Sequence, residues 1–112
     1  MYSQRYEIKK IIREFKDSLG KHGIRTERVI LFGSHARGTA QEDSDIDLIV
    51  ISNDFKDMDF MQRCECLGRA IAEIMEPIEP LAYTPEEFNI EKQKKNILHE
   101  VLLEPHIVEY QA

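Results

Sequence analysis

Two stretches of the chain repeat apolar residues at the spacing of an amphipathic helix. The first is residues 4–20, which the glycines at positions 20 and 23 bring to an end. Its apolar positions are Ile8, Ile11, Ile12, Phe15 and Leu19. The second is residues 58–76, which Pro77 stops. The stripe predicted to be buried on this second helix consists of Phe60, Cys64, Leu67, Ile71 and Met75.

Three shorter apolar runs predict β-strands. Residues 28–32 are rich in β-branched side chains. Residues 45–52 become apolar on both faces of the predicted strand, which favours a central place in the sheet. Residues 78–83 contain Pro80, which cannot donate a ladder hydrogen bond and therefore indicates either an edge position or an irregular ladder.

The C-terminal third predicts a further helix and a last strand. Thr84 is the predicted N-cap, with Pro85 in the first helical position and Glu87 completing a capping box. The helix is expected to run to about residue 103, with a break near Asn89 or Asn96, and residues 106–110 predict a short strand. The order α-β-β-α-β-α-β predicts one α/β domain over residues 1–112, with a short mixed sheet. Helices 4–20 and 58–76 are expected to pack on one face of it.

Composition narrows the classes of protein that fit this pattern. The chain has 112 residues, of which 42% are hydrophobic and 32% charged, and a net charge of -6. An acidic balance disfavours direct nucleic-acid binding, which usually requires a basic face. No apolar run reaches the roughly 20 residues of a membrane-spanning helix. The lack of a signal peptide and the low cysteine count predict a cytoplasmic protein, with Cys64 and Cys66 in neither a disulfide nor a zinc site.

Two carboxylates stand where the second strand begins. Asp45 and Asp47 are two residues apart, so on a strand they point to the same face and repel each other. Paired Mg²⁺ ions would compensate that repulsion, because Mg²⁺ prefers a few carboxylates together with substrate phosphates. Two such ions, about 3.5–4 Å apart, can hold the attacking and leaving oxygens of a phosphoryl or nucleotidyl transfer. Glu79 can supply a third carboxylate if the strand 78–83 lies beside 45–52.

The segment that follows the first strand suits an anion. Gly33 and Ser34 open a turn of small residues, whose backbone N–H groups can form an anion-binding concavity. Arg37 adds a planar guanidinium suited to phosphate, whereas His35 is interpreted as a loop residue. Each of these features alone is common in proteins without such a role. A strand ending in Gly-Ser, then ten residues, then Asp-x-Asp opening a buried strand is a much rarer combination.

The combined pattern, G-S-x10-D-x-D, resembles the nucleotidyltransferase superfamily that includes DNA polymerase beta. The longer run GSHARGTAQEDSDIDLIV is similar to the minimal nucleotidyltransferases, or MNT proteins, of prokaryotes. Their usual form is G-S-x-A-R-G-x-A-x-x-x-S-D-x-D-L. The matching positions are Gly33, Ser34, Ala36, Arg37, Gly38, Ala40, Ser44, Asp45, Asp47 and Leu48.

The resemblance implies a polymerase beta-like nucleotidyltransferase fold and a reaction. It implies Mg²⁺-dependent transfer of a nucleoside monophosphate, AMP from ATP, to a hydroxyl group. Gly33 and Ser34 would hold the triphosphate, and Arg37 is grouped with them as nucleotide-binding. Asp45 and Asp47 would bind the metal. Glu79 would take the place of the third family carboxylate, which is often Asp, as a metal ligand that also activates the acceptor hydroxyl.

The resemblance also implies a partner. MNT proteins are commonly encoded beside HEPN proteins as antitoxins, and can attach AMP to a tyrosine of the HEPN toxin. A HEPN-type toxin is therefore the expected acceptor. Two other hypotheses stay open: an antitoxin that neutralises its partner by contact alone, and a transferase of small molecules such as aminoglycosides. The acceptor, the preferred base and any homo-oligomer also stay open.

Overall fold

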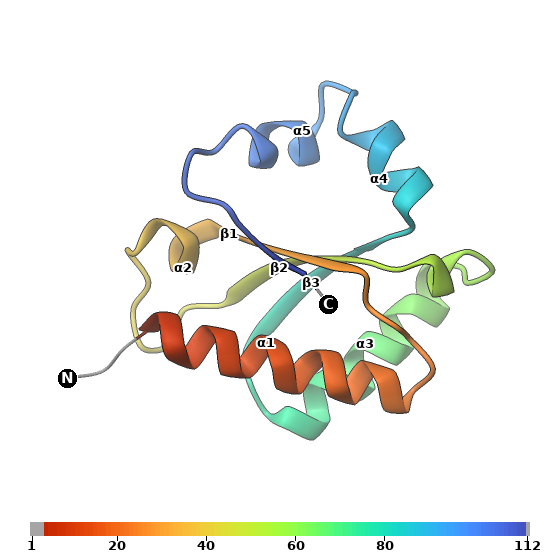
Figure 1. The fold of residues 1–112 in the computed structure, drawn as a ribbon, viewed down its shortest axis with the longest axis horizontal. Helices are drawn as coiled ribbons and strands as arrows, with labels where there is room; N and C mark the ends of the chain where they lie inside the picture. The colour runs from red at the N-terminus through yellow and green to blue at the C-terminus, as the bar shows by residue number, and fades with distance from the viewer. Residues whose placement is uncertain (1–3, 112) are drawn as a thin grey trace.

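A four-stranded mixed β-sheet forms the centre of the computed structural model, which describes residues 4–111 (Figure 1). No helix in this range is both long enough and apolar enough to cross a membrane. The elements, in chain order, are α1 Gln4–Lys21, β1 Arg28–Phe32, α2 Gly33–Arg37, β2 Ile46–Ile51, the 3-10 turn η1 Asn53–Phe55, α3 Phe60–Ile74, β3 Ile78–Tyr83, α4 Pro85–Glu91, α5 Ile97–Leu102 and β4 Val108–Gln111.

The strand order β3-β2-β1-β4 places β2 inside the sheet. β2 pairs in parallel with β3 and antiparallel with β1, which also pairs antiparallel with β4. Every residue of β2 except Asp47 is buried, as a strand covered on both faces requires. β3 is an edge strand, so the missing N–H of Pro80 is tolerated there. The predicted central place of 45–52, the edge place of 78–83 and the last strand are confirmed.

Both faces of the sheet carry helices (Figure 1). α1 and α3 cover one face, where Leu48 and Val50 belong to the same buried cluster as Phe15. α4 and α5 cover the opposite face, where Ile49 packs in a second cluster with Phe88. The prediction that the two long helices share a face is confirmed, but the second helical layer was not expected. α4 and α5 have only seven and six residues, fewer than the roughly 11–18 residues over which an apolar helical face is recognised.

The buried face of α3 differs from the stripe predicted for residues 58–76. Leu67 and Ala70 are buried, whereas Phe60 is 76% exposed and Met75 is 86% exposed. Cys64 is exposed as well, with a free thiol. The predicted burial of Phe60, Cys64 and Met75 is therefore wrong, and the true inward face is rotated around the helix.

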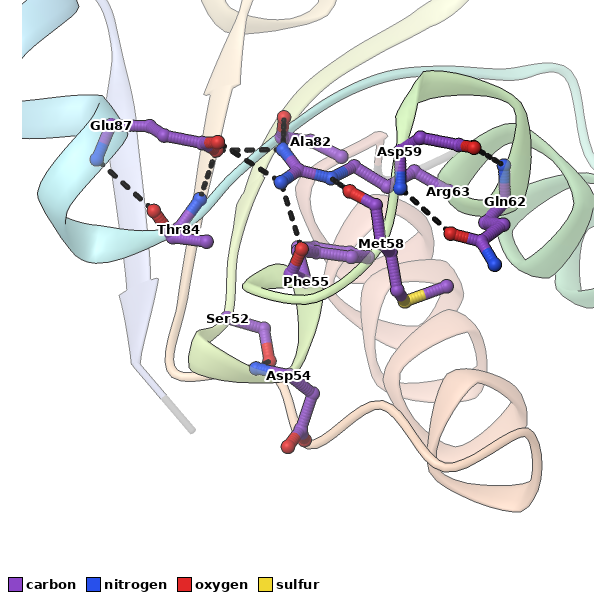
Figure 2. Close-up of polar contacts among 10 residues, drawn as sticks. All are labelled: Ser52, Asp54, Phe55, Met58, Asp59, Gln62, Arg63, Ala82, Thr84 and Glu87. Carbon is purple, nitrogen blue, oxygen red and sulfur yellow. Dashed lines mark hydrogen bonds and ion pairs between the residues drawn. The ribbon is translucent and has the colours of Figure 1, made fainter.

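An arginine explains the rotation. The Arg63 side chain lies on the inward face of α3 and is only 13% exposed. Its guanidinium donates hydrogen bonds to the Phe55 carbonyl at 2.8 Å and to both carboxylate oxygens of Glu87 at 2.6 and 3.0 Å (Figure 2). Its Nε donates to the Met58 carbonyl at 3.1 Å. A pattern of apolar residues cannot reveal an arginine that is buried by its hydrogen bonds.

Local signals in the sequence set the ends of the shorter helices. Thr84 and Glu87 form the predicted capping box, with Pro85 in the first turn of α4. The Asn96 side chain accepts a hydrogen bond from the backbone N–H of His99 and so starts α5. The predicted break near Asn96 is confirmed, and it divides the C-terminal helix into α4 and α5.

Candidate active site

Strand pairing joins the Gly-Ser and Asp-x-Asp halves of the motif. Phe32 pairs with Asp47 across β1 and β2, so Gly33, the next residue, lies beside the Asp47 carboxylate. Asp47 in turn pairs with Glu79 across β2 and β3. Asp45 directly precedes β2, and its hydrogen bond with Glu79 and its charge interaction with Asp47 place it with these two carboxylates on one side of the sheet. This side is the one that α4 and α5 cover, because Asp47 alternates with Leu48, which packs against α1 and α3.

Gly33 is required by its backbone and by its surroundings. Its φ angle is 74°, a left-handed conformation that side chains disfavour. A Cβ atom at this position would also collide with the Asp47 carboxylate. The close approach of the turn to Asp47 therefore depends on the absence of a side chain.

The turn of small residues is a short helix, α2, rather than an irregular loop. It begins at Gly33 and ends at Gly38, whose φ of 77° allows its N–H to donate to the Ser34 carbonyl. The N-cap residue, Phe32, gives the first turn no side-chain hydrogen bond. The first N–H groups of a helix have no acceptor within the helix, so they are suited to phosphate oxygens. The half-buried Ser34 hydroxyl is in the same turn.

The three predicted carboxylates share one electrostatic environment. Partial burial of Asp47 and the charge of Asp45 raise the pKa of Asp47, although His35 and Arg37 act in the opposite direction. The charge of Asp45 and a hydrogen bond to it raise the pKa of the exposed Glu79, and the charge of Asp47 adds to this effect. The charge of Asp45 contributes to both shifts, so the carboxylates repel one another, and a bound cation would relieve that repulsion.

The fit to magnesium rests on two of these carboxylates. Within residues 4–111, no three His, Cys, Asp or Glu side chains gather closely enough to hold a metal ion among themselves. Asp45 and Asp47 nevertheless offer the hard oxygen donors that Mg²⁺ prefers, and Mg²⁺ commonly takes its other ligands from substrate phosphates and water. The predicted role of Glu79 as a metal ligand stays a prediction.

Two further groups near Asp47 were not assigned to the site from the sequence. Glu104, between α5 and β4, raises the pKa of Asp47 and lies 3.7 Å from the Arg37 guanidinium. His35 belongs to α2 rather than to a loop, and its Nε2 donates to the Ser44 carbonyl at 3.2 Å. Glu104 is nearly sixty residues from Asp47 in the chain, and no local pattern marks it.

This arrangement, a Gly-Ser turn against an Asp-x-Asp strand on a mixed sheet, defines a nucleotidyltransferase. The chain belongs to the nucleotidyltransferase domain family, whose match extends over residues 8–112.

Named relatives resemble slightly less than half of the chain. The chain is 44% identical over 52 residues to "Putative protein adenylyltransferase MJ0604" of Methanocaldococcus jannaschii, which is 46% of this chain and 48% of that protein. It is 46% identical over 46 residues to "Putative protein adenylyltransferase MJ0141" of the same organism, 40% of this chain and 46% of that protein. The chain thus spans about half the length of the curated relatives it matches.

Two solved structures share the fold. The crystal structure of a "putative nucleotidyltransferase from Sulfolobus solfataricus" matches this chain with a TM-score of 0.60 and 23% identity. The match covers 78% of this chain and 76% of the other chain. A mutant of the toxin-antitoxin complex MntA-HpeT matches this chain with a TM-score of 0.56 and 17% identity. The match covers 99% of this chain and 75% of the other chain. The predicted polymerase beta-like fold is confirmed.

Proposed function

We propose that this protein transfers AMP from ATP to a hydroxyl group of a partner protein, with Mg²⁺ bound at Asp45 and Asp47. The observation that carries the proposal is the β1–β2 register, which sets Gly33 against Asp47. Membership of the nucleotidyltransferase family and relatives named as protein adenylyltransferases support the reaction type.

Each residue has a separate task in this reaction. The first turn of α2 and the Ser34 hydroxyl bind the triphosphate, and Arg37 adds positive charge. The acceptor oxygen forms a bond to the α-phosphorus while the bond from that phosphorus to the bridging oxygen breaks, and pyrophosphate leaves. Glu79 receives the hydroxyl proton as the general base of the reaction. Mg²⁺, when bound, neutralises the charge of the transferring group.

The proposed acceptor is a tyrosine hydroxyl of a HEPN-type toxin, so the protein would act as an antitoxin. The resemblance to the minimal nucleotidyltransferases motivates this partner. One structural neighbour is itself part of a toxin-antitoxin complex.

The test is an incubation of this protein with the HEPN toxin, ATP and Mg²⁺, followed by intact-mass measurement of the toxin. We expect the toxin to gain the mass of an AMP group. Asp45→Ala or Asp47→Ala should leave almost no product, because losing a metal ligand costs several kcal/mol of transition-state stabilisation and each 1.36 kcal/mol is about tenfold in rate. Asp17→Ala, at an exposed aspartate of α1, is the matched control and should be fully active.

The outcome also separates the competing hypotheses. If the toxin gains no mass yet is neutralised equally by wild type and Asp47→Ala, the protein acts by contact alone. Glu79→Gln should slow transfer more than it weakens ATP binding.

A further inference from the structure

A groove with an apolar lining runs along the outer edge of the sheet, between the first half of α3 and strand β3. Its volume is about 470 Å³, and its lining includes Phe60, Cys64 and Leu67 of α3 together with Pro80 and Leu81 of β3. Phe60 is 76% exposed and Leu81 is 37% exposed. A groove that is lined by an exposed phenylalanine and an exposed leucine is typical of a surface that binds another protein, because aromatic anchors dominate such contacts.

The charges of this groove indicate what kind of molecule fits it. Arg63 lines the groove, but its guanidinium is committed to Glu87 and to backbone carbonyls (Figure 2). Arg63 and Glu87 therefore neutralise each other. The exposed Asp59 lies at the α3 end of the groove, and the exposed Glu79 lies on β3 beyond Leu81. The groove is thus unsuited to phosphate and complementary to a basic segment.

The edge of β3 is closed to an added strand. The Ser52 N–H donates to the Tyr83 carbonyl, so the backbone polar groups of Tyr83 point toward β2. Those of Pro80 and Ala82, which have the opposite parity along the strand, point away from the sheet. Pro80 has no N–H to offer. The Ala82 carbonyl accepts a hydrogen bond from the Arg63 guanidinium at 3.4 Å. A partner must therefore dock through side chains in the groove rather than by extending the sheet.

We infer that this groove seats the acceptor protein. This inference rests on the proposed function and names the surface that delivers the acceptor hydroxyl. Leu81 and Glu79 are two residues apart on β3 and share a face, about 7 Å apart at the backbone. A basic segment with an apolar or aromatic anchor between Phe60 and Leu81 reaches Glu79 within a few of its own residues. The groove thereby controls access of the acceptor, while Gly33 and Ser34 hold the nucleotide.

Binding of the HEPN toxin, measured by calorimetry without ATP, tests the groove separately from catalysis. Phe60→Ser and Leu81→Ser should each weaken binding about tenfold or more, as expected for anchor residues. Ile97→Ser, at a residue of α5 that is 75% exposed, is the matched control and should bind as wild type. Asp59→Asn keeps an N-cap side chain on α3 while removing its charge, so it should slow association and reduce its dependence on salt.

Steady-state kinetics give a second readout. Phe60→Ser should raise KM for the toxin and leave kcat and the ATP affinity unchanged, whereas Glu79→Gln should lower kcat. If the toxin binds at the groove but gains no AMP, the proposed reaction fails and the docking surface stands.

Three outcomes would overturn the inference. The first is equal toxin binding by wild type, Phe60→Ser and Leu81→Ser. The second is a wild-type protein that does not bind the toxin at all. The third is a concentration-dependent dimer of this chain, seen by sedimentation, that Phe60→Ser abolishes, because the groove would then seat a second copy.

Discussion

Gly33 meets two constraints at once, a positive φ and the nearby Asp47 carboxylate. Gly33→Ala should therefore cost about 1–3 kcal/mol of unfolding free energy, the usual cost of a strained backbone position. It should also weaken ATP binding, because α2 must move away from Asp47. Urea denaturation and ATP titration measure the two effects.

Gly20→Ala is the control for this substitution. A Cβ atom at Gly20 would meet no described atom within 4 Å, and Gly20 lies in α1 without a positive φ. This variant should match or exceed wild-type stability, by up to about 1 kcal/mol. An unchanged ATP affinity in a folded Gly33→Ala protein would contradict the role assigned to the turn.

The charge of Asp45 makes the clearest contribution to the repulsion among the three carboxylates. Its charge is the first cause of the raised pKa of Glu79 and the second cause, after burial, for Asp47. An acid whose pKa is raised by folding costs stability above that pKa, and the cost disappears as the pH falls.

We therefore expect Asp45→Asn to stabilise the metal-free protein slightly at neutral pH, because solvent screens charge pairs that are this exposed. The gain should vanish as the pH falls through the raised pKa values of Asp47 and Glu79. Urea denaturation in EDTA across this pH range measures it, with Asp17→Asn as control. A loss of stability in Asp45→Asn would argue against repulsion.

At the scale of elements, most helices and strands could be predicted because their signals are local. The capping box at Thr84 and the edge proline Pro80 are both read correctly from neighbouring residues. The inward face of α3 could not be predicted, because it depends on Arg63 finding acceptors on three other segments of the chain. α2 was not predicted either, since its five residues make little more than one helical turn, too short for a repeating apolar face.

The Arg63–Glu87 pair connects α3 to α4 around the edge of the sheet (Figure 2). Arg63→Met should cost about 2–3 kcal/mol, because it leaves Glu87 and buried carbonyls without their donor, with some relief from solvent at Glu87. Urea denaturation with far-UV circular dichroism measures this loss. If Arg63→Met unfolds with the same free energy as wild type, the Arg63–Glu87 pair does not contribute to stability.

The same pair should make stability depend on pH. The hydrogen bond from Arg63 lowers the pKa of Glu87. An acid with a lowered pKa contributes stability above its ordinary pKa, and the contribution is lost as the pH falls through the lowered value. The stability difference between wild type and Glu87→Gln should thus shrink as the pH falls below about 4. Glu86→Gln, at the exposed neighbour, should show no such trend.

At the scale of the whole molecule, the core of the candidate site could be predicted and its surroundings could not. Gly33, Ser34, Asp45 and Asp47 lie close in the chain, so one motif contains them. Glu104 reaches Asp47 only because α5 and β4 return to the sheet. Such long-range placement leaves no periodic trace in the sequence.

Ligand binding should stabilise the entire fold. At a hundredfold excess over Kd, Mg²⁺ with ATP should add about 2.7 kcal/mol to the unfolding free energy. The double variant Asp45→Asn with Asp47→Asn should lose this gain. Thermal unfolding with and without Mg²⁺ and ATP measures the effect, and an equal gain in the double variant would rule out the metal site.

Because Phe32 pairs with Asp47, the effect of inserting one codon into the gene depends on where it is inserted. One extra residue after Glu42, in the exposed segment before β2, leaves the pairing of both strands unchanged. One extra residue between Ile46 and Asp47 puts the two aspartates on opposite faces of the sheet, because side chains alternate along a strand. A library of single-codon insertions should therefore yield active clones from the first position and none from the second, although both insertions change the length of the protein equally.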